Sequence, residues 1–171
     1  MAVTINGNGT IIPTSAVQPA GSILQVVSGH NTGKTTVSNS GFTSFLTCPV
    51  TITPSSTSSK ILVSVYTQIG RTPNGNLRVK LYRDISGGST GTDLTPTSEV
   101  CWFGHWNDYS YYTTTSIGKT FVDTTHSTTS AITYKLYGDT EGTSVTGVIG
   151  GRAGDAFFNQ GTDWVLMEVA G

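Results

Sequence analysis

The sequence predicts an all-β protein, an antiparallel β-sandwich preceded by an extended N-terminal arm. Among its 171 residues are 30 Thr and 19 Ser but only seven Ala and three Glu, so β-branched residues are abundant and strong helix formers scarce. Apolar residues come in short runs separated by turn-rich stretches, a spacing typical of sandwiches and barrels. With 36% apolar residues and a net charge of −1, the composition is that of a folded chain.

The first 21 residues differ from the rest, and we expect them to form the arm, with one sandwich domain at 22–171. Residues 4–11 contain two Asn-Gly steps, either of which suits the tight turn of a small hairpin. Pro13 and Pro19 then interrupt regular strand pairing. A chain of this length is expected to form one domain rather than two.

Two segments predict strands most clearly. Residues 60–69 alternate between apolar side chains on one face and polar ones, including Tyr66 and Gln68, on the other. One face is therefore expected in the core, and the other is available to meet a partner. Pro73-Asn74-Gly75-Asn76 follows as the strongest hairpin signal in the chain, and residues 77–82 alternate again as a second strand.

Shorter apolar runs predict the remaining strands, for a total of about eight to ten and no helix. These runs lie at residues 23–27, 42–46, 47–53, 120–123, 132–137, 144–149 and 164–169, and residues 100–106 and 109–112 form an aromatic segment.

Charge and targeting signals exclude several classes of protein. Charged residues make up only 11% of the chain, and the nine Lys and Arg are dispersed, which argues against a nucleic-acid-binding protein. No apolar run approaches the ~20 residues that cross a bilayer, and the N-terminus lacks signal-peptide features. We expect synthesis in the cytoplasm without membrane insertion. In such a protein Cys48 and Cys101 are expected to be buried thiols, although their spacing leaves a pairing open.

No motif predicts catalysis, a metal or a cofactor. His30, His105 and His126 are not at metal-ligand spacing, and the two cysteines form no Cys-x-x-Cys motif. With 19 Ser and ten acidic residues, a hydrolase triad or carboxylate pair cannot be told from coincidence. We therefore expect a protein that is not an enzyme.

The aromatic segment is the strongest candidate for a functional surface. It contains Trp102, Trp106, Tyr109, Tyr111 and Tyr112. Such rings most often fill a core or a subunit interface, which is the first interpretation. A platform for sugar rings is the second.

Seven short segments spread over most of the chain carry a family resemblance. They are Thr4-Ile5-Asn6-Gly7-Asn8-Gly9-Thr10-Ile11, Gly21-Ser22-Ile23-Leu24-Gln25-Val26, Ile52-Thr53-Pro54-Ser55, Ser59-Lys60-Ile61-Leu62-Val63, Leu81-Tyr82-Arg83-Asp84, Ala131-Ile132-Thr133-Tyr134-Lys135 and Leu166-Met167-Glu168-Val169-Ala170. Together they resemble tail-fibre, head-fibre and capsid-decoration proteins of tailed phages. The resemblance implies a virion location, a trimer and a jelly-roll sandwich.

Among virion roles, the sequence favours a homotrimeric capsid decoration, or cement, protein that binds the major capsid protein or other virion proteins. A ~20-residue arm is too short for a fibre shaft at ~3.3 Å per residue. Its apolar residues Ile5, Ile11, Ile12 and Val17 are expected to make the attachment contacts by strand addition. The alternative is a tail- or head-fibre knob that binds host surface polysaccharide through Trp102 and the neighbouring aromatics. A capsule-glycan hydrolase ranks last.

Overall fold

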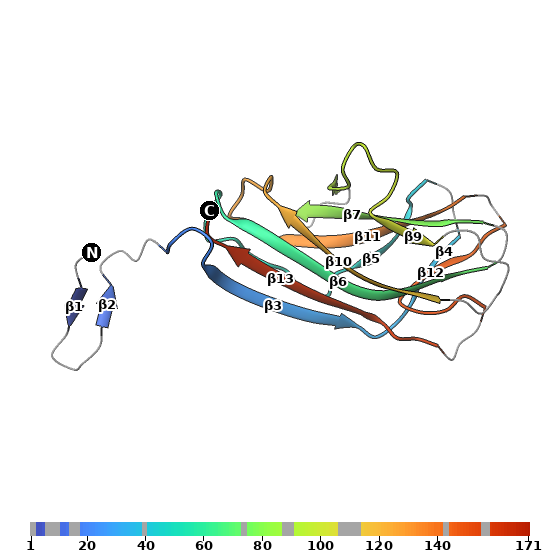
Figure 1. Ribbon diagram of the computed structural model, residues 1–171, viewed down its shortest axis with the longest axis horizontal. Helices are drawn as coiled ribbons and strands as arrows, with labels where there is room; N and C mark the ends of the chain where they lie inside the picture. The colour runs from blue at the N-terminus through green and yellow to red at the C-terminus, as the bar shows by residue number, and fades with distance from the viewer. Residues whose placement is uncertain are drawn as a thin grey trace.

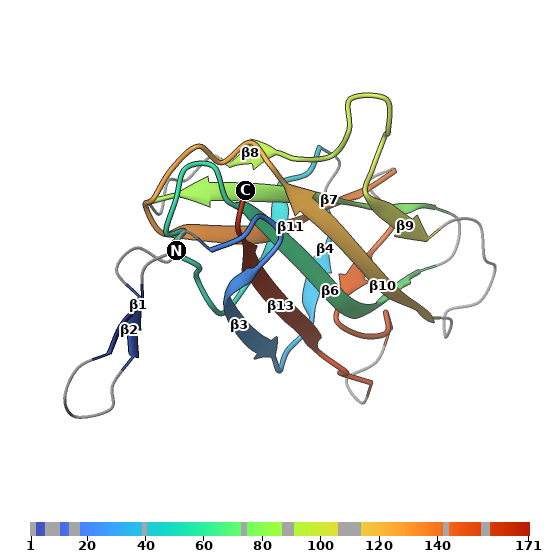
Figure 2. The same ribbon diagram turned by 60° about the vertical axis from the view of Figure 1, so that its left-hand side comes forward.

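The computed structural model describes residues 18–38, 41–72, 75–86, 91–105, 114–141, 144–154 and 158–171 in full, and residues 3–5 and 11–13 as backbone. Every regular element in these residues is a β-strand, and every strand pair is antiparallel. The predicted all-β class is confirmed. Figures 1 and 2 show two sheets packed face to face.

The first sheet is built around β6 (Lys60–Arg71), a twelve-residue strand. On one edge β6 pairs with β10 (Thr114–Asp123), and on the other with β13 (Thr162–Val169), which separates β6 from β3 (Ile23–Asn31). The last residues of β6 pair with β12 (Gly147–Ile149), which in turn pairs with β4 (Thr35–Val37).

The second sheet is built around β11 and β7. Strand β11 (Ile132–Thr140) lies between β5 (Ser44–Thr47) and β7 (Leu77–Ile85). The free edge of β7 pairs with two short strands, β8 (Thr92–Asp93) and β9 (Phe103–His105).

The strand order is that of a jelly roll. In the first sheet the order is β3-β13-β6-β10, and it faces β5-β11-β7 followed by β8 and β9. If β8 and β9 count as one interrupted strand, the two sheets contain eight strands, which can be numbered 1 to 8 along the chain from β3 to β13, leaving out β4 and β12. The order is then 1-8-3-6 in the first sheet and 2-7-4-5 in the second. This is the double Greek key that defines a jelly roll. The topology therefore agrees with the jelly roll that the sequence resemblance implied.

Alternating strand residues form the core between the sheets. Val63 and Val65 of β6 and Leu166 of β13 are fully buried and share one apolar cluster with Leu81 and Leu136 of the second sheet. Burying a side chain of this size contributes about 1.5–3 kcal/mol to stability.

The structure corrects three expectations about the strands. The hairpin expected at Pro73-Asn74-Gly75-Asn76 is wrong, because β6 and β7, the strands on either side, lie in different sheets. Residues 47–53 hold only the end of β5 and one isolated bridge, from Ile52 to Ile132. Conversely, β10 begins at Thr114, six residues before the expected strand.

The N-terminal segment contains a small hairpin. Strand β1 (Val3–Ile5) pairs with β2 (Ile11–Pro13) in a two-stranded sheet of its own. The sandwich pairing starts at Gly21, whose N–H donates to the carbonyl of Ala170. Figure 1 draws the hairpin beyond the end of the sandwich that holds the C-terminus, which we call the arm end.

Candidate functional site

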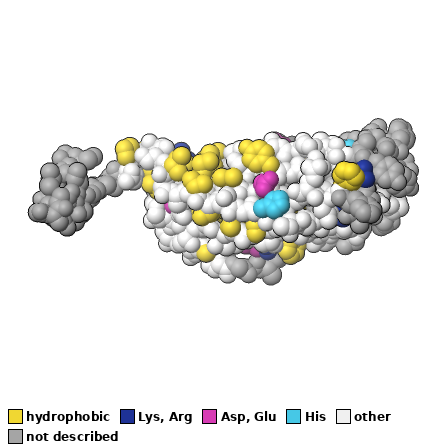
Figure 3. Space-filling model, turned by 90° about the horizontal axis from the view of Figure 1, so that it is seen from below, with side chains coloured by type: hydrophobic (Ala, Val, Ile, Leu, Met, Phe, Trp, Pro, Cys, Tyr) yellow, Lys and Arg dark blue, Asp and Glu magenta, His cyan; other side chains and the backbone are white. Residues whose placement is uncertain are grey.

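The outer face of the first sheet carries a row of apolar side chains that crosses four strands. The strand register aligns Val26 of β3, Met167 of β13, Leu62 of β6 and Val122 of β10. Val26 is 54% exposed and Val122 45% exposed. We call these four residues the apolar row, and Figure 3 shows apolar side chains gathered on this side of the molecule. The row is close to the arm end, since β3 begins only three residues before Val26.

Farther from the arm end, the same face becomes polar. Ser64 and Thr120 face each other across β6 and β10, with their hydroxyl oxygens 2.9 Å apart. The next row places His30, Asp163, Tyr66 and Gly118 side by side on the four strands. Tyr66 is four residues from Leu62, so this row lies about 13 Å from the apolar row at ~3.3 Å per residue.

A groove of about 280 Å³ opens around Tyr66. This volume is near the lower end of the range for small-molecule sites. Its lining includes Tyr66 and Gln68 of β6, Ser116 of β10, Asp163 of β13, and Gln160 from the segment that leads into β13.

The aromatic ring in the groove packs against a glycine. Tyr66 is 55% exposed, and a Cβ at Gly118 would be 3.1 Å from ring atoms Cδ1 and Cε1. The ring therefore lies against the bare backbone of β10. A side chain at position 118 would push the ring outward.

Hydrogen bonds orient the polar groups of the groove. The Nδ1 atom of His30 is 2.7 Å from Oδ1 of Asp163, whose side chain is 64% exposed. Gln68 donates from Nε2 to the Ser116 hydroxyl at 3.3 Å. Gly161 has a φ of +75°, and a Cβ there would be 2.6 Å from Cε1 of His30. Only glycine combines this backbone conformation with the close approach of the imidazole.

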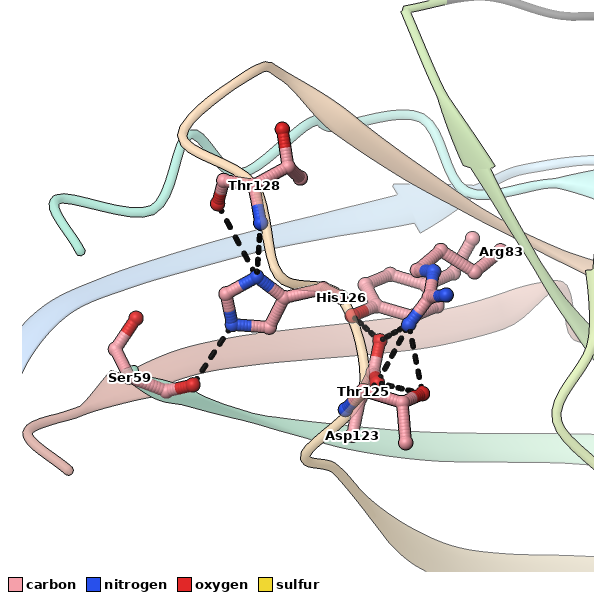
Figure 4. Close-up of polar contacts among 7 residues, drawn as sticks. Ser59, Arg83, Asp123, Thr125, His126 and Thr128 are labelled. Carbon is pink, nitrogen blue, oxygen red and sulfur yellow. Dashed lines mark hydrogen bonds and ion pairs between the residues drawn. The ribbon is translucent and has the colours of Figure 1, made fainter. Parts of the chain in front are cut away.

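A second polar cluster is buried between the sheets and is shown in Figure 4. Arg83 donates from Nη1 to both carboxylate oxygens of Asp123, at 2.7 and 2.9 Å, and the Tyr134 hydroxyl donates to Asp123 Oδ2 at 2.9 Å. Burial, and then the negative charge of Asp123, raises the pKa of Tyr134 far above its usual range. The phenol keeps its proton and acts as a donor, so the cluster joins β7, β10 and β11 rather than supplying a nucleophile.

The loop after β10 is fixed by a buried histidine, also drawn in Figure 4. Nε2 of His126 is 2.8 Å from the carbonyl oxygen of Ser59. Because a carbonyl only accepts, Nε2 donates to Ser59, while Nδ1 lies 3.3 Å from the backbone nitrogen of Thr128 and 3.2 Å from its carbonyl oxygen. This histidine is committed to structural contacts.

A buried carboxylate closes the arm end. Glu168 is fully buried and accepts hydrogen bonds from Gln25 Nε2 at 2.6 Å, the Ser55 N–H at 2.7 Å and the Ser55 hydroxyl at 2.8 Å. Burial opposes its ionisation, but bonds from Gln25, Ser55 and Ser59 outweigh that effect and lower the pKa of Glu168.

The two cysteines are free thiols. Cys48 is buried, as expected, and burial raises the pKa of its thiol to about 11. Cys101 is only partly buried, so the expectation of two buried thiols is wrong for this residue. Burial also raises the pKa of Cys101.

Within the described ranges, no three His, Cys, Asp or Glu side chains gather as metal ligands would. The described part of the chain also has no helix of the length and hydropathy that a membrane crossing needs.

The residues singled out from sequence fall in different places. Trp102 is 4% exposed and packs in the core, so its ring offers no free face to a sugar. Trp106, Tyr109, Tyr111 and Tyr112 lie outside the described residues. Of the arm residues, Ile5 is in β1, Ile11 and Ile12 are in β2, and Val17 lies outside the described residues.

Sequence reasoning found part of the exposed face and missed the rest. Alternation placed Tyr66 and Gln68 on the outer side of β6, where they line the groove. It did not find Asp163 or Gln160, which come from a segment almost 100 residues away in the chain. Only the pairing of β13 with β6 brings these residues together.

No protein-family model and no curated protein matches this chain. Solved structures with a similar arrangement come from infectious bursal disease virus. The Gx strain structure has a TM-score of 0.43 at 10% identity, covering 92% of this chain and 40% of that chain. The T13 viral particle has a TM-score of 0.45 at 12% identity over 93% and 40%, and the VP2 subviral particle 0.44 at 10% over 93% and 42%. The chain thus spans about two fifths of the proteins it resembles.

Proposed function

We propose that this chain is a non-enzymatic structural protein of a virion surface, a homotrimeric decoration protein that binds the shell at its arm end. The apolar row carries the proposal. Four apolar side chains, level with one another on four adjacent strands, present a continuous strip that favours contact with another protein surface. The sequence resemblance to tailed-phage virion proteins supports the location.

The composition of the chain supports assembly with identical copies. A net charge of −1 and a hydroxyl-rich surface allow copies to approach without strong repulsion. Antiparallel pairing across both sheets gives a rigid subunit. The hairpin of β1 and β2 precedes the sandwich, and its backbone supplies edges for strand addition to a shell protein.

The receptor-binding knob is the second candidate function, and the groove around Tyr66 favours it. The groove lies on the part of the sheet away from the arm end, so attachment at that end leaves it accessible. Both roles place the protein on a virion, and they differ in copy number. Decoration of a shell requires hundreds of copies, whereas fibres require few.

Self-association is tested by charge insertion in the apolar row. The variant Val26→Lys is compared with Thr114→Lys, which places the same charge on β10 at the opposite end of the same sheet. Light scattering coupled to gel filtration should report a trimer for the native chain and for Thr114→Lys, and a monomer for Val26→Lys. A monomeric native chain, or equal trimers in both variants, contradicts the proposal that the apolar row forms the trimer contact.

Attachment is tested by deleting residues 1–21. The truncated chain should fold and lose co-sedimentation with virus particles stripped of this protein, while the full chain rebinds to its original copy number. Stoichiometric binding of the truncated chain excludes the arm as the attachment element.

A further inference from the structure

We infer that the groove around Tyr66 is a binding site for a neutral pyranose sugar. The inference rests on the geometry of the groove and does not depend on the virion role. It also moves the expected sugar platform from the segment around Trp102 to the outer face of β6.

The aromatic platform is the first component. One face of the Tyr66 ring is backed by Gly118, and the side chain is 55% exposed. A ring backed on one face and open on the other can stack on the C–H face of a sugar, because those hydrogens meet the negative face of the π system. The contact with Gly118 restricts the ring on that side, which lowers the entropy lost on binding.

The polar groups are the second component. Asp163, Gln68, Gln160 and Ser116 converge on the same groove and offer both acceptors and donors. A sugar hydroxyl is donor and acceptor at once, so it matches a mixed set of this kind. The bond from His30 orients the Asp163 carboxylate, which remains 64% exposed for a charge-assisted bond to a hydroxyl.

The charges of the groove exclude other ligand classes. None of its lining residues is Lys or Arg, and Asp163 repels anions, so phosphate groups and nucleotides are poor ligands. An ammonium ion would contact Tyr66 and Asp163, but the amide N–H groups of Gln68 and Gln160 would make no hydrogen bond to it. The chemistry best matched to all the lining groups is a neutral polyhydroxyl ring.

The test is an amide NMR titration of the ¹⁵N-labelled full chain. Methyl glycosides of glucose, galactose, mannose and N-acetylglucosamine are added to about 50 mM, since one shallow subsite predicts a Kd in the millimolar range. Saturable shifts are expected at Gly118, Gln160 and Gly161 for at least one glycoside. Absence of saturable shifts there for all four overturns the inference.

Variants separate stacking from general surface effects. Tyr66→Ala should raise the Kd by about three- to tenfold, the ratio expected for one lost ring contact, while Tyr66→Phe stays within about twofold. Gly118→Val, which displaces the ring, should weaken binding similarly. Phe45→Ala removes a ring of similar exposure from the other sheet and should change nothing.

The remaining outcomes oppose the inference. Unchanged binding by Tyr66→Ala, with its spectrum elsewhere intact, overturns it. Tighter binding of tetramethylammonium chloride than of every glycoside assigns the groove to cations instead. Trimer formation and particle binding are measured separately, so loss of sugar binding does not contradict the virion proposal. Failure of the trimer or particle-binding test likewise does not contradict the sugar site.

Discussion

The buried pair of Arg83 and Asp123 gives the sharpest test of how the two sheets are held together. Their side chains are 7% and 0% exposed. Asp123→Ala leaves the Arg83 guanidinium charged and without its carboxylate, and it removes the acceptor of the Tyr134 hydroxyl. Breaking a buried pair on one side costs about 3–5 kcal/mol, because an uncompensated charge stays in a low-dielectric interior.

This cost should appear in urea unfolding followed by tryptophan fluorescence. The free energy of unfolding of Asp123→Ala should fall by about 3–5 kcal/mol. In a thermal scan, the Tm should be lower by about 6–20 °C for a domain of this size. The triple variant Arg83→Met, Asp123→Leu, Tyr134→Phe removes charge and hydroxyl together and should recover most of that loss. The reasoning is refuted if Asp123→Ala costs under about 1 kcal/mol, the value of an exposed pair, or if the triple variant is no more stable than the single one.

Three further predictions concern groups elsewhere in the molecule. Because the pKa of Glu168 is lower in the folded state, its contribution is present above about pH 5 and is lost as pH falls through the folded pKa. Glu168→Gln should lower the free energy of unfolding at pH 7 by about 1–3 kcal/mol and reduce its decrease as the pH falls below about 5. A variant whose stability falls with acid as steeply as that of the native chain contradicts this. Cys48, with a thiol pKa of about 11, should resist a disulfide reagent at pH 8 until urea unfolds the chain, whereas Cys101 should react first; mass mapping of the labelled peptides decides the order. Gly161→Ala places a Cβ 2.2 Å from the carbonyl oxygen of Asn31 at a positive φ and should lower the Tm by more than about 5 °C in a thermal scan, so a neutral result would mean that the backbone there relaxes freely.

The alternation of apolar and polar residues predicted the strands that have one solvent-exposed face and one buried face. Residues 60–69 are the clearest case, because every second side chain of β6 enters the core. Strand β10 was mostly missed, since its outward residues Ser116, Gly118 and Thr120 are small or hydroxylic and only Ile117 and Phe121 mark the inner face. A strand with so few apolar residues has the composition of a loop.

Pairing partners were not predictable from the same patterns. The turn signal at Pro73-Asn74-Gly75-Asn76 is local, and it describes a reversal of direction without specifying whether the next strand joins the same sheet. The groove depends on such pairing, since Asp163 reaches Tyr66 only through the register of β13 on β6. The side chain of Tyr66 was therefore foreseeable, but its neighbours were not.

The position of β13 makes the order of synthesis matter. It comes last among the sandwich strands in sequence order, yet it lies between β3 and β6 and hydrogen-bonds to both. A nascent polypeptide that has not reached Thr162 holds two open strand edges and lacks Trp164, which is fully buried in the finished domain. The first sheet therefore cannot close until β13 has been synthesised, and a product that terminates before Thr162 keeps the edges of β3 and β6 open.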